Sequence, residues 1–324
     1  MPPEVAPVRA GEDLDVAALS RYLKQPVEIA QFPNGHSNLV YLVRTADREY
    51  VLRRPPLGPV APKAHDMARE YRVLSAVHPH FPEAPEPFLL CVDASVIGST
   101  FFLMERRHGV VVRETLPPEW NPRAVGEAFI DCLVRLHAID IATPELSALG
   151  KPEGFVSRQV RGWAERWRRA GTNDVPALDA VIRWLEQRIP PSFAPTLLHN
   201  DFKLDNVMLG PDGASVHAVL DWEMATIGDP LADVGLALCY WTNWSPPGLC
   251  TRDQFVDRYA RATGRDMTHL GYHEVLGIFK LAVILQQIYY RFRCGQTNDE
   301  RFRSLNARVR RLATLAAEKA ESLG

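Results

Sequence analysis

Residues 197–209, LLHNDFKLDNVML, place a histidine, two asparagines, two aspartates and a lysine between apolar neighbours. A surface loop does not need the flanking leucines, and a core strand does not tolerate the charges. The segment therefore predicts a polar loop that the leucines anchor in the core, so that its side chains are held at fixed positions.

The spacing of the polar residues in this loop is specific. His199, Asp201 and Asn206 fit H-x-D-x-x-x-x-N, and Asp221 follows 15 residues after Asn206 at the end of the strand-like stretch ASVHAVLDWE. This is the arrangement of the catalytic loop and the metal-binding aspartate in protein-kinase-like phosphotransferases. A buried turn with capping roles is the alternative interpretation of the loop alone.

Phosphoryl transfer would explain why each of these polar residues is present. The reaction needs an acceptor hydroxyl oriented in line and metal ions on the phosphates. Asp201 can accept the hydroxyl proton, and Lys203 can touch the transferred phosphate unless it is a solvated loop lysine. Asn206 and Asp221 offer the oxygen ligands that Mg²⁺ prefers. Glu223 is expected on the same face of the strand as Asp221, within reach of a metal through water.

Composition bounds the class of protein. The chain has 324 residues, 46% of them apolar, and a net charge of −2, so it is long enough for two lobes and has no basic field that predicts nucleic acid or an anionic membrane. We expect no transmembrane helix and no signal peptide, because charges interrupt the apolar runs and residues 1–15 lack an apolar core. Five scattered cysteines predict free thiols in the cytoplasm and no zinc site.

Hydrophobic periodicity predicts a β-rich half followed by a helical half. Strands are expected within 27–54 and 85–107, and helices within 12–24, 62–77, 121–140, 158–170, 175–189 and 305–323. Asn121 is the expected N-cap of its helix, with Pro122 at the first helical position. The predicted fold class is α+β in two lobes: 1–105, β-rich and nucleotide-binding, and 106–324, helical, with the catalytic loop.

The β-rich half supplies candidates for binding a nucleotide. FPNGHSNLVYLV (32–43) lies between strands, where a phosphate-covering loop belongs. Its candidate nucleotide-binding residues are Gly35, His36, Ser37 and Asn38. With one glycine it fails G-x-G-x-x-G, and by itself it is a hairpin turn.

Two further segments complete the nucleotide site. In YVLRR (50–54), Arg53 occupies the position of the phosphate-binding lysine, and Arg54 is expected on the opposite face. A register shifted by one residue, which would exchange the roles of the two arginines, is the alternative. Glu70 is expected on the next helix as the partner of Arg53, with a surface charge as the alternative. The adenine is expected to contact the backbone of Met104, Glu105 and Arg106, in the hinge FFLMERRHG (101–109).

The chain resembles the aminoglycoside phosphotransferase and choline kinase-like family, which has the protein-kinase-like fold. LLHNDFKLDNVML and AVLDWEMATIGDPLADVG (218–235) carry the resemblance, which spans about residues 25–300. FPNGHSNLVYLV, YVLRRPP, RQVRGWAERW and KLAVILQQIYYR are most similar to the kinase-like domains that occur fused to acyl-CoA dehydrogenases. The resemblance implies a catalytic base at Asp201, Mg²⁺ ligands at Asn206 and Asp221, and a structural role for His199.

Two residues depart from the family pattern. Asn200 replaces a glycine, and Arg53 replaces a lysine that arginine does not mimic as a point charge. Asp229 and Asp233 are expected to be structural, with Asp233 capping a helix or bracing the catalytic loop, and Trp222 is expected in the core.

The acceptor is expected in the helical half. Arginines of two helices there can bind an anionic group, with solvated helix faces as the alternative: Arg158, Arg161, Arg291 and Arg293. A polycationic aminoglycoside would need carboxylates instead, which favours another hydroxyl substrate, such as a hydroxyacyl-CoA.

The sequence predicts a magnesium-dependent kinase that uses ATP or GTP to phosphorylate a small-molecule hydroxyl. A catalytically weak, nucleotide-binding pseudokinase is the alternative, supported by Arg53, Asn200 and the glycine-poor loop. A protein kinase is disfavoured, since A-P-E and an activation segment are missing, and a P-loop NTPase is excluded by its missing motif. Whether the protein forms a homodimer is left open.

Overall fold

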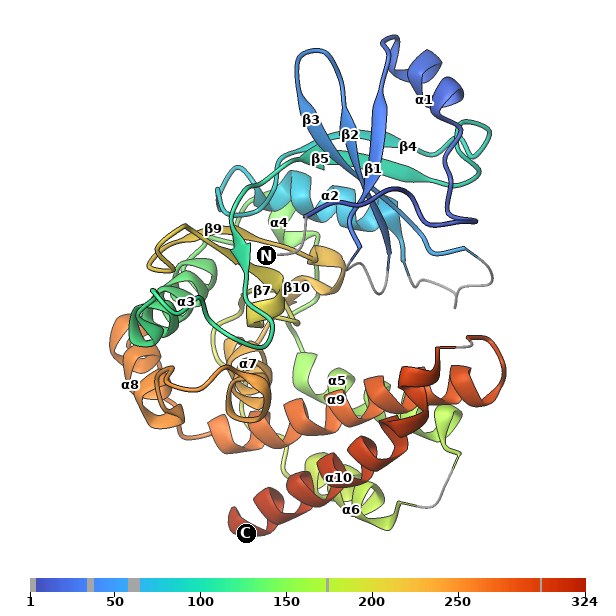
Figure 1. The fold of residues 1–324 in the computed structure, drawn as a ribbon. Coiled ribbons are helices and arrows are strands. Elements are labelled where there is room, and N and C mark those ends of the chain that lie inside the picture. The colour runs from blue at the N-terminus through green and yellow to red at the C-terminus, as the bar shows by residue number, and fades with distance from the viewer. Residues whose placement is uncertain (1–3, 34–37, 58–64, 173–174, 298) are drawn as a thin grey trace. The chain divides into compact units, whose positions relative to one another are not determined.

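The structure is a computed structural model that describes residues 4–33, 38–57, 65–172, 175–297 and 299–324 (Figure 1). The chain forms two compact units. One comprises Met1–Val110, Val207–Pro211 and Val216–Met224, and the other comprises Val111–Asn206, Asp212–Ser215 and Ala225–Gly324. The β-rich first part and the helical second part confirm the predicted α+β class. The division differs from the predicted one at 105, because residues 207–211 and 216–224 return to the first unit.

An antiparallel five-stranded sheet forms the frame of the first unit. Its strand order is β1-β2-β3-β5-β4. The strands are β1 (Glu28–Gln31), β2 (Leu39–Arg44), β3 (Glu49–Arg54), β4 (Pro87–Cys91) and β5 (Phe101–Glu105). Tyr41, Val43, Leu52, Phe101 and Leu103 are buried in one cluster. Because side chains alternate along a strand, these core residues fix which face each neighbour takes.

The α-helices α1 and α2 belong to this unit. Helix α1 (Val16–Leu23) begins at Asp15, whose carboxylate accepts a hydrogen bond from the amide of Ala18. Helix α2 (Met67–Val77) begins at Asp66, which accepts from the amide of Arg69 in the same way. An aspartate at this position satisfies one of the free amides of the first turn. The first turn of α2 also contains Glu70, which is 1% exposed.

Residues 207–224 form a hairpin followed by a turn. β8 (Val207–Leu209) pairs antiparallel with β9 (Val216–Val219). The 3₁₀-helix η2 (Trp222–Met224) follows, and Trp222 is buried as predicted, with its ring centroid 5.9 Å from that of Phe81. The indole also donates a hydrogen bond to the carbonyl of Val219. This turn is therefore fixed to the body of the first unit.

The second unit is mainly helical. It contains α3 (Pro122–His137), α4 (Pro144–Ser147), α5 (Phe155–Ala170), α6 (Pro176–Gln187), α7 (Pro230–Trp244), α8 (Arg252–Thr263), α9 (Leu270–Arg293), η3 (Glu300–Ser304) and α10 (Leu305–Ser322). Its short pieces are β7 (Thr196–Leu198), η1 (Leu204–Asn206) and β10 (Thr226–Gly228), and β6 (Val110–Val111) lies at the division. Asn121 caps α3 and Pro122 opens it, as predicted.

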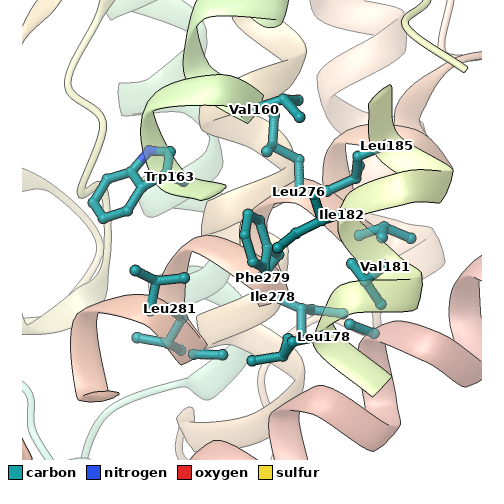
Figure 2. Packing of buried hydrophobic residues seen from close by; sticks show 14 of the residues in the cluster. Val160, Trp163, Leu178, Val181, Ile182, Leu185, Leu276, Ile278, Phe279 and Leu281 are labelled. Carbon is teal, nitrogen blue, oxygen red and sulfur yellow. The ribbon is translucent and has the colours of Figure 1, made fainter. Parts of the chain in front are cut away.

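The core of the second unit forms where α5, α6 and α9 meet (Figure 2). Val160 and Trp163 come from α5, Ile182 from α6, and Leu276 and Phe279 from α9. By length and composition alone α9 could cross a membrane, but 61% of its apolar window is buried within the protein. Its packing is that of a core helix.

Two glycines bring α7 and α9 close together. A Cβ atom on Gly235 of α7 would lie 2.5 Å from the carbonyl carbon of His273, and one on Gly277 would lie 3.0 Å from the carbonyl oxygen of Gly235. Real Cβ atoms do not approach another atom as closely as 2.5 Å, so only glycine fits at position 235, whereas a side chain at position 277 would have to push its neighbour slightly aside. This contact sets the position of Asp233 and Lys280, which lie two and three residues away from these glycines along their helices.

Candidate active site

A buried ion-pair cluster lies in the first unit. The Arg53 side chain on β3 places Nη1 2.9 Å from Oε1 of Glu70 and Nη2 3.0 Å from Oδ1 of Asp221. The side chains of Arg53 and Glu70 are 9% and 1% exposed, whereas that of Asp221 is 28% exposed. The predicted pairing of Arg53 with Glu70 is confirmed, and Asp221 adds a second carboxylate that the sequence did not assign to this cation.

Charge keeps this cluster together. Burial acts to lower the pKa of Arg53, but Glu70, Asp221 and Glu223 outweigh it and raise that pKa further above its ordinary value. Burial raises the pKa of Glu70, with Asp221 and Glu223 adding to the rise and Arg53 opposing it. A raised pKa favours the charged form of Arg53 but the neutral, protonated form of Glu70. Because a guanidinium stays protonated in proteins, Arg53 remains the cation, and Glu70 is the member that can take up a proton.

Arg54 lies on the opposite side of β3 from the cluster, as the alternation of the strand predicts. It is not a surface residue, however. It is 6% exposed, and its Nη1 donates a hydrogen bond to the carbonyl of Ile97 at 3.0 Å. Arg54 is thus a buried structural residue.

Asp221 has a left-handed backbone, with φ at 70°. Aspartate is among the few residues other than glycine that adopt this conformation readily. The strand ends at Val219, and Trp222–Met224 form the 3₁₀ turn, so the expectation that Glu223 shares a strand face with Asp221 is wrong. Glu223 nevertheless lies in this cluster, and its Oε2 accepts a hydrogen bond from Nδ2 of Asn38 at 3.4 Å.

The remaining nucleotide-site predictions divide between described and undescribed residues. Gly35, His36 and Ser37 lie outside the described residues, while Asn38 is 2% exposed and its Oδ1 lies 2.8 Å from Nδ1 of His65. At the predicted hinge, Met104 and Glu105 end β5, and the amide of Glu105 donates to the carbonyl of Glu86. Arg106 is paired with Glu4 at 2.7 Å. Their role toward a nucleotide stays a prediction.

The second unit holds the candidate base. Oδ1 of Asp201 accepts from the hydroxyl of Tyr240 at 3.0 Å, and Oδ2 accepts from Nδ2 of Asn206 at 2.9 Å. Nζ of Lys203 lies 2.9 Å from the same Oδ2, and the Asp201 side chain is 18% exposed. The loop thus gathers Asp201, Lys203 and Asn206, and it holds a carboxylate that solvent can still reach.

Asp233 of α7 braces the backbone of this loop, which was one of its two predicted roles. Its Oδ2 accepts the amide of His199 and its Oδ1 the amide of Asn200, each at 2.6 Å. Burial acts to raise the pKa of Asp233, but His137 and His199 outweigh it and hold that pKa below its usual value. An ionised carboxylate is the form that accepts two amides.

Asn200 and His199 are structural parts of the loop. Asn200 has φ at 64°, the left-handed region, where glycine is at ease and asparagine is tolerated. The replacement of glycine is therefore compatible with this backbone. His199 is fully buried, and its Nδ1 lies 3.3 Å from the amide nitrogen of Asp201, which donates to it.

Two residues of this site were missed by sequence reasoning. Tyr240 lies in the apolar stretch of α7, and its contact with Asp201 has no sequence signal. Burial and then the Asp201 carboxylate raise the pKa of Tyr240 well above its ordinary value, so its hydroxyl stays a donor. Lys280 of α9 donates to the carbonyl of Asn200 at 2.7 Å. A lysine in an apolar helix was the one available hint.

The arginines predicted to bind the acceptor are exposed on α5 and at the end of α9. Arg158 donates to the backbone carbonyls of Lys151 and Glu153, and Nη1 of Arg293 donates to the hydroxyl of Tyr289 at 3.2 Å. Arg161 and Arg291 complete the predicted set. Their role stays a prediction.

Comparison with known proteins identifies the family. The phosphotransferase enzyme family matches residues 28–275. Acyl-CoA dehydrogenase family member 10 of Mus musculus is 33% identical over 99% of this chain, which spans 33% of that protein. Member 11 of Gallus gallus is 32% identical, and the chain spans 45% of it. The chain thus covers a third to a half of these relatives.

Solved structures agree with this assignment. A protein from Ralstonia eutropha JMP134, described as a putative aminoglycoside phosphotransferase, has a TM-score of 0.83 and 28% identity, with 96% of this chain and 99% of that one covered. The aminoglycoside phosphotransferase APH(4)-Ia, with 18% identity and a TM-score of 0.63 over 94% of this chain and 98% of that one, shares the fold. From the family match and this likeness, we conclude that the chain belongs to the phosphotransferase enzyme family.

Proposed function

We propose that this phosphotransferase moves the γ-phosphate of ATP or GTP to a hydroxyl of a small molecule. The observation that carries the proposal is the state of Asp201. Its carboxylate is held by Tyr240 and Asn206, yet it is still 18% exposed. A base must combine a fixed position with access to the hydroxyl proton, and this carboxylate has both.

In this reaction Asp201 accepts the proton of the acceptor hydroxyl as the oxygen bonds to the γ-phosphorus. The bond from that phosphorus to the bridging oxygen breaks, and the nucleoside diphosphate leaves. Lys203, 2.9 Å from Asp201, supplies positive charge near the transferred group. The protein contributes position and electrostatics, which is what phosphoryl transfer requires.

Arg53 is the candidate for binding the nucleotide phosphates. Glu70 and Asp221 fix its guanidinium, and a fixed guanidinium can bind phosphate through paired N–H groups. Support comes from the fold: structures of APH(4)-Ia variants are described as complexes with hygromycin B and either ADP or AMP-PNP. In this proposal Arg53 supplies the buried positive charge that a lysine supplies in the wider family.

The residues present fit Mg²⁺. Both amide hydrogen bonds of Asn206 are donated by Nδ2 to Asp201, so its Oδ1 remains an available oxygen ligand. Asp221 offers a partly exposed carboxylate. As proposed ligands, Asn206 and Asp221 would each supply one oxygen to the ion, which would neutralise charge on the phosphates. Magnesium commonly takes one or two protein ligands and completes its shell with water and phosphate oxygens.

For the acceptor we propose a hydroxyacyl-CoA rather than an aminoglycoside. The relatives of this chain in Mus musculus and Gallus gallus are named as acyl-CoA dehydrogenase family members, which suggests an acyl-CoA as the acceptor. The exposed arginines of α5 and α9 suit an anionic acceptor, whereas a polycation would meet repulsion there.

A panel of hydroxyacyl-CoAs, other hydroxylated metabolites and aminoglycosides, incubated with γ-labelled ATP or GTP and Mg²⁺, tests the proposal. We expect label in a hydroxyacyl-CoA with the wild-type protein and loss of that label with Asp201→Asn. Label in an aminoglycoside alone would overturn the proposed acceptor. Nucleotide binding without transfer to any acceptor would favour the weakly catalytic nucleotide-binding alternative.

A further inference from the structure

Lys280 is a buried lysine that the proposed reaction does not use. It lies on α9, is 6% exposed, and donates from Nζ to the carbonyl oxygen of Asn200 at 2.7 Å. Nζ also lies 5.6 Å from the ring centroid of Trp163, which Figure 2 shows on α5. In the part of the chain that the structure describes, no carboxylate oxygen lies within 4.0 Å of Nζ. The ammonium is therefore committed to a backbone carbonyl.

That carbonyl belongs to the peptide that joins Asn200 to Asp201. Lys280 holds the oxygen of this peptide, and Nδ1 of His199 accepts its N–H at 3.3 Å. The preceding amide, that of Asn200, is held by Asp233 at 2.6 Å. The orientation of a peptide plane limits the direction of the next Cα–Cβ bond. These contacts therefore help to set the direction in which the Asp201 side chain leaves the backbone.

The two side chains that hold this loop backbone, those of Asp233 and Lys280, come from helices in close contact. Asp233 lies two residues before Gly235 on α7, and Lys280 lies three residues after Gly277 on α9. Because these glycines let the two helix backbones touch, the distance between the two clamping side chains is set by backbone packing. A long lysine side chain is thereby held at a defined place.

A space-filling role does not explain a lysine here. An apolar side chain of similar length would fill the same volume without burying a charge. Burial lowers the pKa of Lys280 to about 8, against the opposing pull of Asp201 and Asp233, while Arg166 and Lys203 lower it further. A residue that carries this cost next to the base points to a functional role.

We propose that Lys280 is a positioning residue for phosphoryl transfer, because it orients the Asn200–Asp201 peptide and thereby the carboxylate of the base. This inference rests on the proposed function. It concerns the geometry of Asp201 and not the binding of the nucleotide. Misplacement of a reacting group by about 1 Å can cost about 10²-fold in rate, so the effect belongs in kcat.

The test compares Lys280→Met with Lys280→Arg and, as a matched control, the exposed Lys151→Met. Methionine fills the space, which matters because a cavity of about 20 Å³ borders Asn200 and Lys280 and would admit a water molecule if the side chain were shortened. We expect kcat to fall about 10- to 100-fold in Lys280→Met. The KM for nucleotide should stay within about two-fold, with substantial activity in Lys280→Arg and none lost in Lys151→Met.

Hydrogen exchange of the peptide that contains residues 198–204 provides a readout that needs no acceptor. We expect faster exchange of this peptide in Lys280→Met and protection restored in Lys280→Arg. If Lys280→Met does not fold, Lys280→Gln, which is too short to repeat the bond, is expected to show the same changes.

The outcomes separate the two proposals. Unchanged kcat together with unchanged loop exchange would overturn the role of Lys280, as would equal losses of kcat and folded protein. If the wild-type protein turns over no acceptor, the proposed function fails. Loop exchange then decides whether Lys280 orients the peptide.

Discussion

In each unit a buried cation lies close to an aspartate of the proposed reaction, and the two cations are stabilised in different ways. In the first unit, Arg53 lies between the carboxylates of Glu70 and Asp221, at 2.9 and 3.0 Å. In the second unit, Lys280 has a neutral carbonyl, that of Asn200, at 2.7 Å. Carboxylates raise the pKa of Arg53 beyond its ordinary value, whereas burial lowers that of Lys280 to about 8.

This difference shows what each region holds in place. The first region fixes side chains through charges that lie far apart in the sequence, so the cation and its carboxylates depend on one another. The second region fixes a backbone: Asp233 and Lys280 bind the amide and carbonyl of Asn200, and the Asp201 side chain stays partly exposed to solvent. Removal of the cation should therefore lower the stability of the first region, whereas removal of the Asp201 carboxylate in the second region should mainly lower turnover.

The largest effect is expected from Asp201→Asn. Because this carboxylate is not a partner on which the loop backbone depends, the change should lower kcat by about 10²–10⁴-fold, the usual contribution of a positioned base. The melting temperature should move by no more than about 2 °C. Steady-state kinetics with the identified acceptor and a thermal scan measure the two. Near-normal turnover would reject Asp201 as the base.

Removal of Arg53 tests the interdependence of the first region. Arg53→Ala leaves the carboxylate of Glu70, which is 1% exposed, without its cation. We therefore expect the free energy of unfolding to fall by about 3–5 kcal/mol. Urea denaturation measures it. Arg54→Ala is the matched control: it loses one hydrogen bond to a carbonyl and should cost about 1–2 kcal/mol.

Nucleotide binding separates the two arginines as well. Arg53→Ala should weaken ATP binding measured by calorimetry, while Arg54→Ala should leave it unchanged. Equal effects of the two substitutions on both measurements would contradict the distinction between a phosphate-binding and a structural arginine.

Asp221→Ala separates ion pairing from metal binding. Arg53 keeps Glu70 as a partner in this variant, so the protein should fold. A ligand at 100 times its Kd stabilises the native state by about 3 kcal/mol, and we expect the variant to lose that gain from ATP with Mg²⁺. The exposed Asp212→Ala should keep it. If the thermal shift is the same in all three proteins, Asp221 does not bind the metal.

The smallest effect is the pH dependence contributed by Lys280. Its folded-state pKa of about 8 lies below the ordinary 10.5, so the unfolded chain binds more protons between these values. The cost of the buried charge is complete below pH 8 and is relieved as pH rises toward 10.5. The stability of the wild-type protein relative to Lys280→Met should therefore rise by about 1–3 kcal/mol across this window.

Urea unfolding of both proteins at several pH values between 7 and 10.5 measures this difference. A constant difference would show that Lys280 has an ordinary pKa. The contrast between the two buried cations would then be wrong.

Much of the site followed from spacing. The motif of His199, Asp201 and Asn206 predicted the loop, and strand alternation predicted that Arg53, and not Arg54, reaches Glu70. The orientation of Glu223 was wrong because the chain leaves the strand at Val219 for a 3₁₀ turn. The left-handed backbone of Asp221 directly precedes this turn, and the sequence pattern does not report it.

By itself, the sequence predicted the residues of the proposed chemistry and the elements that carry them. Motif spacing and hydrophobic period are local properties, and both can be determined from one sequence without a structure. Tertiary structure alone decided which distant residues hold these groups. Tyr240 and Lys280 reach the loop from helices 39 and 80 residues away along the chain, and Asp221 joins Arg53 across 168. Such contacts depend on how close helices and strands pack, as at Gly235 and Gly277, and no local pattern encodes that distance.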